Sequence, residues 1–97
     1  MEIIQSETFK RWFSKLKDCQ AKARIAARIR RASLSNLGDM KTLRDGLFEM
    51  RIDYGRGYRV YCIKKGQVLI VLLTGGNKSS QDADIDKAII LAKEWRD

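Results

Sequence analysis

The chain has 97 residues and a mass of 11.2 kDa, which is the size of one domain. With 44% hydrophobic and 33% charged residues it can form a core, and its composition is not that of a disordered protein. Histidine is absent, which excludes Ser–His and Cys–His nucleophile pairs. Cys19 and Cys62 stand far apart without the spacing of a zinc site or a disulfide scaffold, so we expect two small core residues, no metal and no cofactor.

The chain is strongly basic, because 20 Lys and Arg residues outnumber 12 Asp and Glu residues and give a net charge of +8. This excess is typical of proteins that bind polyanions, and a charge that only keeps the surface soluble is the alternative. The first 20 residues do not resemble a signal peptide, and the longest apolar run, residues 68–73, is far shorter than a membrane helix. We therefore expect a cytoplasmic protein.

The first two expected elements are a short edge strand at residues 1–5 and an amphipathic helix at residues 7–16. Ser6 precedes this helix as an N-cap, and Glu7 in its first turn complements the helix dipole. The helical spacing is set by Phe9, Trp12, Phe13 and Leu16.

A second helix is predicted from residue 19 to residue 34, with Asp18 as its cap and a breaker segment at residues 35–39. Its expected core face is formed by Ala21, Ile25, Ile29 and Ala32. Another face carries a basic stripe of Lys17, Arg24, Arg28 and Arg31. The stripe is either an ordinary solvated face or a surface that contacts phosphates or acidic groups of a partner.

From Leu47 onward the pattern alternates with a period of two, which predicts three antiparallel strands joined as a meander at residues 47–53, 58–64 and 67–74. The segment 75–77 is expected to end the third strand. Ser79 and Asp82 resemble a capping box for a last amphipathic helix that extends to Trp95.

The predicted fold class is therefore α+β, with a short N-terminal strand, two helices, an antiparallel meander sheet and a C-terminal helix. We expect a single domain of residues 1–97, with the helices packed on one face of the sheet.

Two groups of basic residues in the second half of the chain are candidates for a site. Arg51, Arg59 and Tyr61 are expected on a polar sheet face, where they would either clamp a phosphate or form ordinary ion pairs, such as Glu49 with Arg59. Lys78 lies in the glycine-rich loop 75–78, just before a helix N-terminus. This loop either binds an anion or simply ends a strand.

The run LFEMRIDYGRGYRVY at residues 47–61 resembles the RelE/ParE toxin superfamily, and within it the HigB-like addiction module killer proteins. The apolar strand at 68–73, GGNKS at 75–79 and AKEWR at 92–96 are also similar to that family. The resemblance implies a RelE/ParE-like fold and the toxin of a type II toxin–antitoxin module.

The resemblance also implies an activity and partners. Many members of the superfamily cleave mRNA on the ribosome without a metal, and another branch poisons DNA gyrase. We therefore expect an endoribonuclease (an mRNA interferase) that arrests translation, with a cognate antitoxin, the ribosome and mRNA as partners. The alternatives are a gyrase poison and a non-toxic basic nucleic-acid-binding module. The basic stripe is then a candidate surface for antitoxin or ribosomal RNA.

The family's basic residues correspond here to Arg51, Arg59 and Lys78, and more loosely to the substrate-binding Arg56. These cations would stabilise a phosphorane when an RNA 2′-hydroxyl attacks its own 3′-phosphate, and Lys78 would share that role or act as an acid.

Several family members use a Tyr or His near the C-terminus, but residues 80–95 contain neither. Tyr58 and Tyr61 are the candidates to replace it, and they are also expected to bind substrate. Glu49 is the candidate base, although neighbouring arginines favour its charged form.

Overall fold

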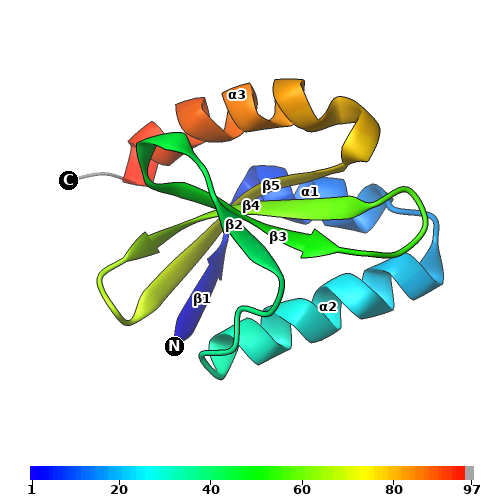
Figure 1. Ribbon diagram of the computed structural model, residues 1–97, viewed down its shortest axis with the longest axis horizontal. Helices are drawn as coiled ribbons and strands as arrows, with labels where there is room; N and C mark the ends of the chain where they lie inside the picture. The colour runs from blue at the N-terminus through cyan, green and yellow to red at the C-terminus, as the bar shows by residue number, and fades with distance from the viewer. Residues whose placement is uncertain (96–97) are drawn as a thin grey trace.

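The structure is a computed structural model that describes residues 1–95, so Arg96 of the last family-like segment lies outside the described residues. Five strands form one sheet in the order β1-β5-β4-β3-β2, and β1 is parallel to β5 while the other pairs are antiparallel (Figure 1). This confirms the predicted α+β class and the RelE-like arrangement. The elements are β1 (Glu2–Gln5), α1 (Glu7–Lys15), α2 (Cys19–Ser33), β2 (Met40–Thr42), η1 (Arg44–Gly46), β3 (Leu47–Ile52), β4 (Tyr58–Lys65), β5 (Leu69–Asn77), η2 (Lys78–Ser80), α3 (Gln81–Ala92) and η3 (Lys93–Trp95).

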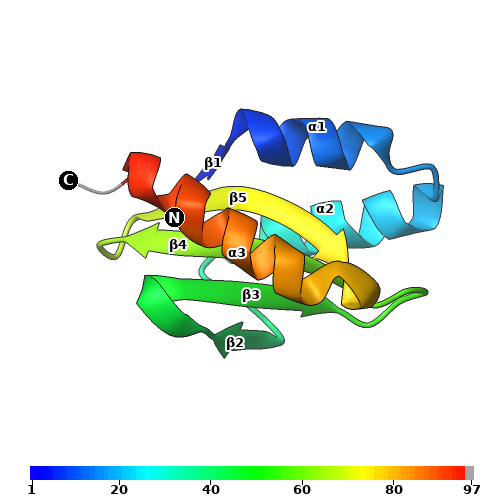
Figure 2. The ribbon, with the colours of Figure 1, turned by 90° about the horizontal axis from the view of Figure 1, so that it is seen from above.

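The helices cover both faces of the sheet, so the expectation of helices on one face is wrong. Helices α1 and α2 pack on one face, whereas α3 crosses the other (Figures 1 and 2). The reason is that β4 and β5 are apolar on both faces, and each face needs a cover. The first core includes Phe9, Ile25, Phe48, Met50 and Leu72, and the second includes Leu47, Tyr61, Leu73, Ala88 and Ala92.

Strand β2 was not expected from the sequence. It has three residues, of which only Met40 is partly buried, so it shows no periodicity. It forms because Met40 pairs with Met50 and extends the β3 edge. Among residues 1–95, no helix has the length and the apolar character that crossing a membrane requires.

The N-caps of α1 and α2 are as predicted. Ser6 Oγ accepts a hydrogen bond from the Phe9 amide at 3.0 Å and donates one to the Leu73 carbonyl at 2.7 Å, which ties α1 to β5. Asp18 accepts from the first amides of α2. The predicted Ser79–Asp82 capping box is wrong, because Asn77 and Ser80 form the box two residues earlier, on η2.

Gly75 and Gly76 do not end β5, which continues to Asn77. The two residues are sandwiched between helices. A Cβ at position 75 would lie 2.3 Å from the Trp12 ring of α1, and one at position 76 would lie 1.8 Å from the Asp84 carboxylate of α3. Glycine is therefore required here by close packing on the two sheet faces.

We expect Gly75→Ala to destabilise the fold by about 1–3 kcal/mol, because the added methyl group overlaps the Trp12 ring and forces it to move. Urea unfolding measures this cost. In a Trp12→Leu background the same substitution should cost clearly less, since the smaller side chain leaves room. Equal costs in both backgrounds would contradict this account of Gly75.

The two cysteines differ in their surroundings, and only one of them matches the expectation of a core residue. Cys62 is fully buried, whereas Cys19 is exposed at the first position of α2. The prediction is wrong for Cys19 because position 19 lies away from the buried face of α2, which includes Ala21 and Ile25.

Candidate functional site

Arg51 and Arg59 are directly opposite each other on β3 and β4, so their side chains emerge on the same sheet face, the one that α3 covers. The Arg51 side chain is 40% exposed and that of Arg59 is 14% exposed. Like charges that face each other across a strand pair are destabilising. Each arginine therefore has a carboxylate beside it.

The partner of Arg59 is Glu49, with 3.6 Å between Arg59 Nε and Glu49 Oε2. Glu49 is only 1% exposed. Arg51 instead pairs with Asp39, with 2.9 Å between Arg51 Nη2 and Asp39 Oδ1, and this hydrogen bond raises the pKa of Arg51. The cross-strand ion pair of Glu49 and Arg59, which the sequence left as an alternative, is thus present.

Tyr61 lies beside this pair, because it is the register partner of Glu49 on β4. It is fully buried, and its hydroxyl has no hydrogen-bond partner among the described residues. Burial raises the pKa of Tyr61, and the charges of Glu49 and Asp84 act in the same direction. The expected exposed polar sheet face is therefore wrong for Glu49 and Tyr61, since α3 packs over them.

Buried Tyr61 and Cys62 make the fold sensitive to alkaline pH. Burial raises the pKa of both groups in the folded state, so the unfolded chain loses these protons first. Their contribution to stability is complete below about pH 8.5 and is lost progressively as the pH rises further. We expect a lower urea midpoint at about pH 10.5 than at about pH 7.5. Cys62→Val should flatten this profile and Cys19→Ser should not; an unchanged profile for Cys62→Val would contradict the assignment.

The turn between β3 and β4 carries the other predicted residues. Arg56 is exposed in it, and its carbonyl accepts a hydrogen bond from the Lys78 amide at 3.3 Å. The exposed Lys78 thus lies beside this turn, at the end of β5. Tyr58 points to the opposite face from Arg59, into the core under α1 and α2, and is 8% exposed.

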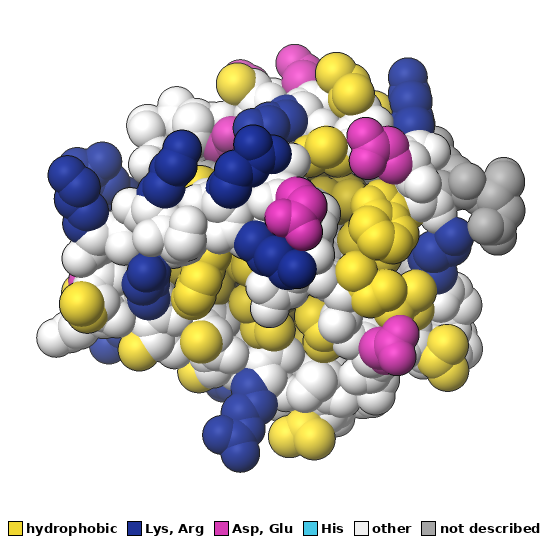
Figure 3. All heavy atoms as spheres, turned by 180° about the vertical axis from the view of Figure 1, so that it is seen from behind, with side chains coloured by type: hydrophobic (Ala, Val, Ile, Leu, Met, Phe, Trp, Pro, Cys, Tyr) yellow, Lys and Arg dark blue, Asp and Glu magenta, His cyan; other side chains and the backbone are white. Residues whose placement is uncertain are grey.

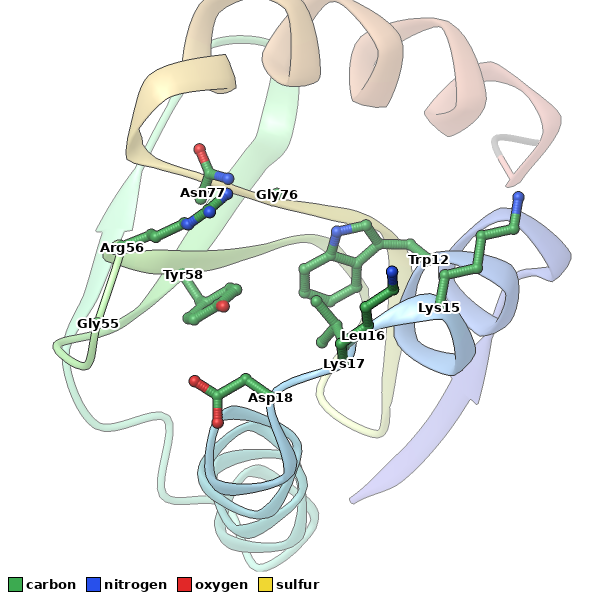
Figure 4. A pocket seen from close by; sticks show the side chains of 10 residues that line it. All are labelled: Trp12, Lys15, Leu16, Lys17, Asp18, Gly55, Arg56, Tyr58, Gly76 and Asn77. Atoms are coloured by element: carbon green, nitrogen blue, oxygen red, sulfur yellow. The ribbon is translucent and has the colours of Figure 1, made fainter.

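A cleft of about 400 Å³ opens on this α1–α2 side of the sheet (Figure 4). It includes the predicted residues Lys17, Arg56 and Tyr58. Sequence reasoning missed Trp12 and Lys15, and the available signal was the basic Lys15-Leu16-Lys17 segment that follows an aromatic residue. The cleft is lined by Trp12, Lys15, Leu16, Lys17, Asp18, Gly55, Arg56, Tyr58, Gly76 and Asn77.

Residues 11–96 match the family described as "Phage derived protein Gp49-like (DUF891)". The chain belongs to this Gp49-like family. The family is commonly grouped with the RelE/HigB-like toxins. A relative from Haemophilus influenzae, described only as an uncharacterized protein, is 52% identical over 94 residues, which cover 97% of this chain and 95% of the relative. No solved structure matches the chain.

In this Gp49-like protein the predicted basic stripe does not exist as four exposed side chains. Arg28 is only 8% exposed, and its guanidinium donates to the carbonyls of Arg51, Leu37 and Asp39. Burial lowers the pKa of Arg28. Position 28 falls on the buried helix face with Ala21, Ile25 and Ala32, a spacing of four, three and four residues.

The rest of the stripe is spread over different surroundings. Lys17 lines the cleft, whereas the Arg24 guanidinium lies 4.6 Å from the centre of the Tyr54 ring, and Arg31 is exposed. Seen from behind, Lys and Arg side chains gather toward one end of this Gp49-like protein, beside exposed hydrophobic side chains (Figure 3). Within residues 1–95, no cluster of three or more Cys, Asp or Glu side chains is arranged to hold a metal ion.

Proposed function

We propose that this Gp49-like protein is the toxin of a type II toxin–antitoxin module and cleaves mRNA on the ribosome without a metal. The observation that carries the proposal is the pair Arg51 and Arg59, which face each other on one sheet face although both are positively charged. Asp39 and Glu49 offset part of the repulsion within this pair, and the two guanidinium groups on one sheet face also fit the oxygens of a phosphate group.

The chemistry follows from the residues at this end of the sheet. The RNA 2′-hydroxyl loses its proton to solvent water and attacks the adjacent phosphorus, a new P–O bond forms, and the bond to the 5′ oxygen breaks as that oxygen takes up a proton. Arg51 and Arg59 stabilise the charge that develops on the phosphorane. Lys78, exposed at the end of β5, either shares this role or protonates the leaving oxygen.

Glu49 has a different proposed role from the base that the sequence suggested. It is buried and paired with Arg59, so it is placed to hold that guanidinium in position. Because Arg59 occupies the Glu49 carboxylate, the rate would depend strongly on how the ribosome positions the mRNA. Positioning alone contributes up to about 7–11 kcal/mol in favourable cases.

The expected protein partner is a cognate antitoxin with an acidic or amphipathic segment. The net charge of +8 favours an acidic partner, and Arg24, Arg31 and Lys17 remain candidates to contact it or ribosomal RNA.

A brief induction of the protein without an antitoxin tests the proposal, followed by mapping of mRNA 5′ ends in the same cells. New ends inside translated codons, together with growth arrest, are the expected result. Arrest with intact mRNA would reject cleavage and lead to a gyrase supercoiling assay. If the cells showed neither growth arrest nor mRNA cleavage, the toxin function would be rejected, and a basic nucleic-acid-binding module would be the remaining alternative.

A further inference from the structure

We propose that the cleft between α1 and the β3–β4 turn binds one nucleotide of single-stranded RNA, with its base beside Trp12 and its phosphates at Lys15, Lys17 and Arg56. This inference rests on the proposed function, because it places RNA on the protein. The cleft lies on the opposite sheet face from Arg51 and Arg59, and it adds a second contact to RNA beyond that pair.

The aromatic wall of the cleft is held rigidly. One part of the Trp12 ring rests on Gly75, where even a methyl group would overlap it, and Phe9 packs against Trp12 with 5.7 Å between ring centres. Trp12 and Tyr58 lie on opposite sides of the cleft (Figure 4). A fixed aromatic ring at the edge of an open cleft is what nucleobases stack on, whatever their sequence.

The charge of the cleft fits an anion. Three of its lining side chains are cationic, and Asp18 is the acidic one. The Asp18 carboxylate is already engaged, because it accepts from the Gln20 and Ala21 amides at 3.0 and 3.1 Å as the cap of α2. The three cations outnumber this one carboxylate, and the excess positive charge favours the phosphates of a bound strand.

The size and the position of the cleft fit a single nucleotide next to the proposed cleavage site. Its volume of about 400 Å³ is within the range of pockets for small ligands. Gly55 and Gly76 line it without side chains, so a nucleic-acid backbone can approach closely. The turn that carries Arg56 also contacts Lys78, so a strand leaving the cleft past this turn reaches the end of β5.

The test measures RNA binding without cleavage. A labelled single-stranded RNA with 2′-O-methyl groups cannot be cut by its own 2′-oxygen, and fluorescence anisotropy gives its Kd at several salt concentrations. We expect the double variant Lys17→Ala/Arg56→Ala to bind about tenfold more weakly and to lower the salt slope by about 1.4, for two lost phosphate contacts. The matched control is Lys64→Ala/Arg44→Ala, which removes the same charge from exposed residues at the other end of β3 and β4.

Equal binding by the two double variants would overturn the proposal, because net charge alone would then explain affinity. A second readout is the emission of Trp12 in a Trp95→Phe background, which leaves Trp12 as the single tryptophan. The RNA should quench this emission, and unchanged emission at saturating RNA would overturn the placement of the base. Neither readout depends on cleavage. If the protein binds RNA in this cleft but no mRNA is cut in cells, the proposed function is rejected and the cleft proposal stands.

Discussion

Replacing Arg59 with alanine is expected to abolish growth arrest and to lower the rate of mRNA cleavage by about 100- to 1,000-fold, the usual loss when one group that stabilises transition-state charge is removed. The reason is the position of its guanidinium, which lies on the same sheet face as Arg51 and beside Glu49. Cleavage is measured by mapping mRNA 5′ ends after induction without antitoxin.

The same substitution also affects stability, because it leaves the buried Glu49 carboxylate without its partner. Breaking a buried ion pair costs about 3–5 kcal/mol, and we expect somewhat less here because Arg59 is partly exposed. Two further variants separate folding from catalysis. Arg59→Lys keeps a positive charge beside Glu49 but loses the planar guanidinium, and Arg59→Ala/Glu49→Gln removes both charges.

Arg44→Ala is the matched control, since Arg44 is an exposed arginine near the opposite end of β3. It should leave cleavage and thermal unfolding nearly unchanged. If the folded Arg59→Lys and Arg59→Ala/Glu49→Gln variants cleaved mRNA as fast as Arg44→Ala, Arg59 would have no part in the reaction.

Arg28→Ala is expected to lower the free energy of unfolding by about 3 kcal/mol, because a buried guanidinium then no longer donates to three backbone carbonyls. For a domain of this size the melting temperature should fall by roughly 12 °C or more. Circular dichroism during heating measures both quantities. Arg31→Ala, on an exposed position of the same helix, is the control and should change stability little.

The loss of Arg28 should also change the position of Arg51 in the candidate site. Arg28 holds the backbone of Asp39 and Arg51, and the Asp39 carboxylate in turn binds the Arg51 guanidinium. We therefore expect Arg28→Ala to reduce cleavage even at a temperature where the variant is folded. An unfolding free energy within about 1 kcal/mol of that of Arg31→Ala would contradict this structural role for Arg28.

Much of the local structure could be predicted because its causes are local. Ser6 and Asp18 mark the starts of α1 and α2, since a side-chain oxygen there satisfies amides two or three residues later. The alternation that begins at Leu47 places Met50 and Ile52 on one sheet face and Arg51 on the other. The sequence also put Arg51 and Arg59 on the same sheet face, because both lie on strands with a clear period of two.

The errors concern features that depend on contacts between distant segments. Position 28 has the spacing of the buried face of α2, but a charged side chain is expected on the surface unless hydrogen bonds compensate for its burial. The carbonyls that accept those hydrogen bonds from Arg28 belong to other parts of the chain. Two consecutive glycines are typical of a strand end, so the sequence predicted that β5 stops at Gly75. The structure keeps both glycines within β5 because Trp12 and Asp84 pack against them and leave no room for a side chain.

The sequence by itself determined the class of the fold, the order of its main elements, the strong basic charge and the candidate cations Arg51, Arg59 and Lys78. These follow from periodicity, capping and composition, which act over a few residues. The tertiary structure alone decided that α3 covers Glu49 and Tyr61, that Arg28 is a buried support, and that Trp12, Lys17 and Arg56 share a cleft. Burial arises where α2 and α3 pack on the two faces of the sheet, and the cleft forms between α1 and the β3–β4 turn, so no short stretch of sequence contains that information.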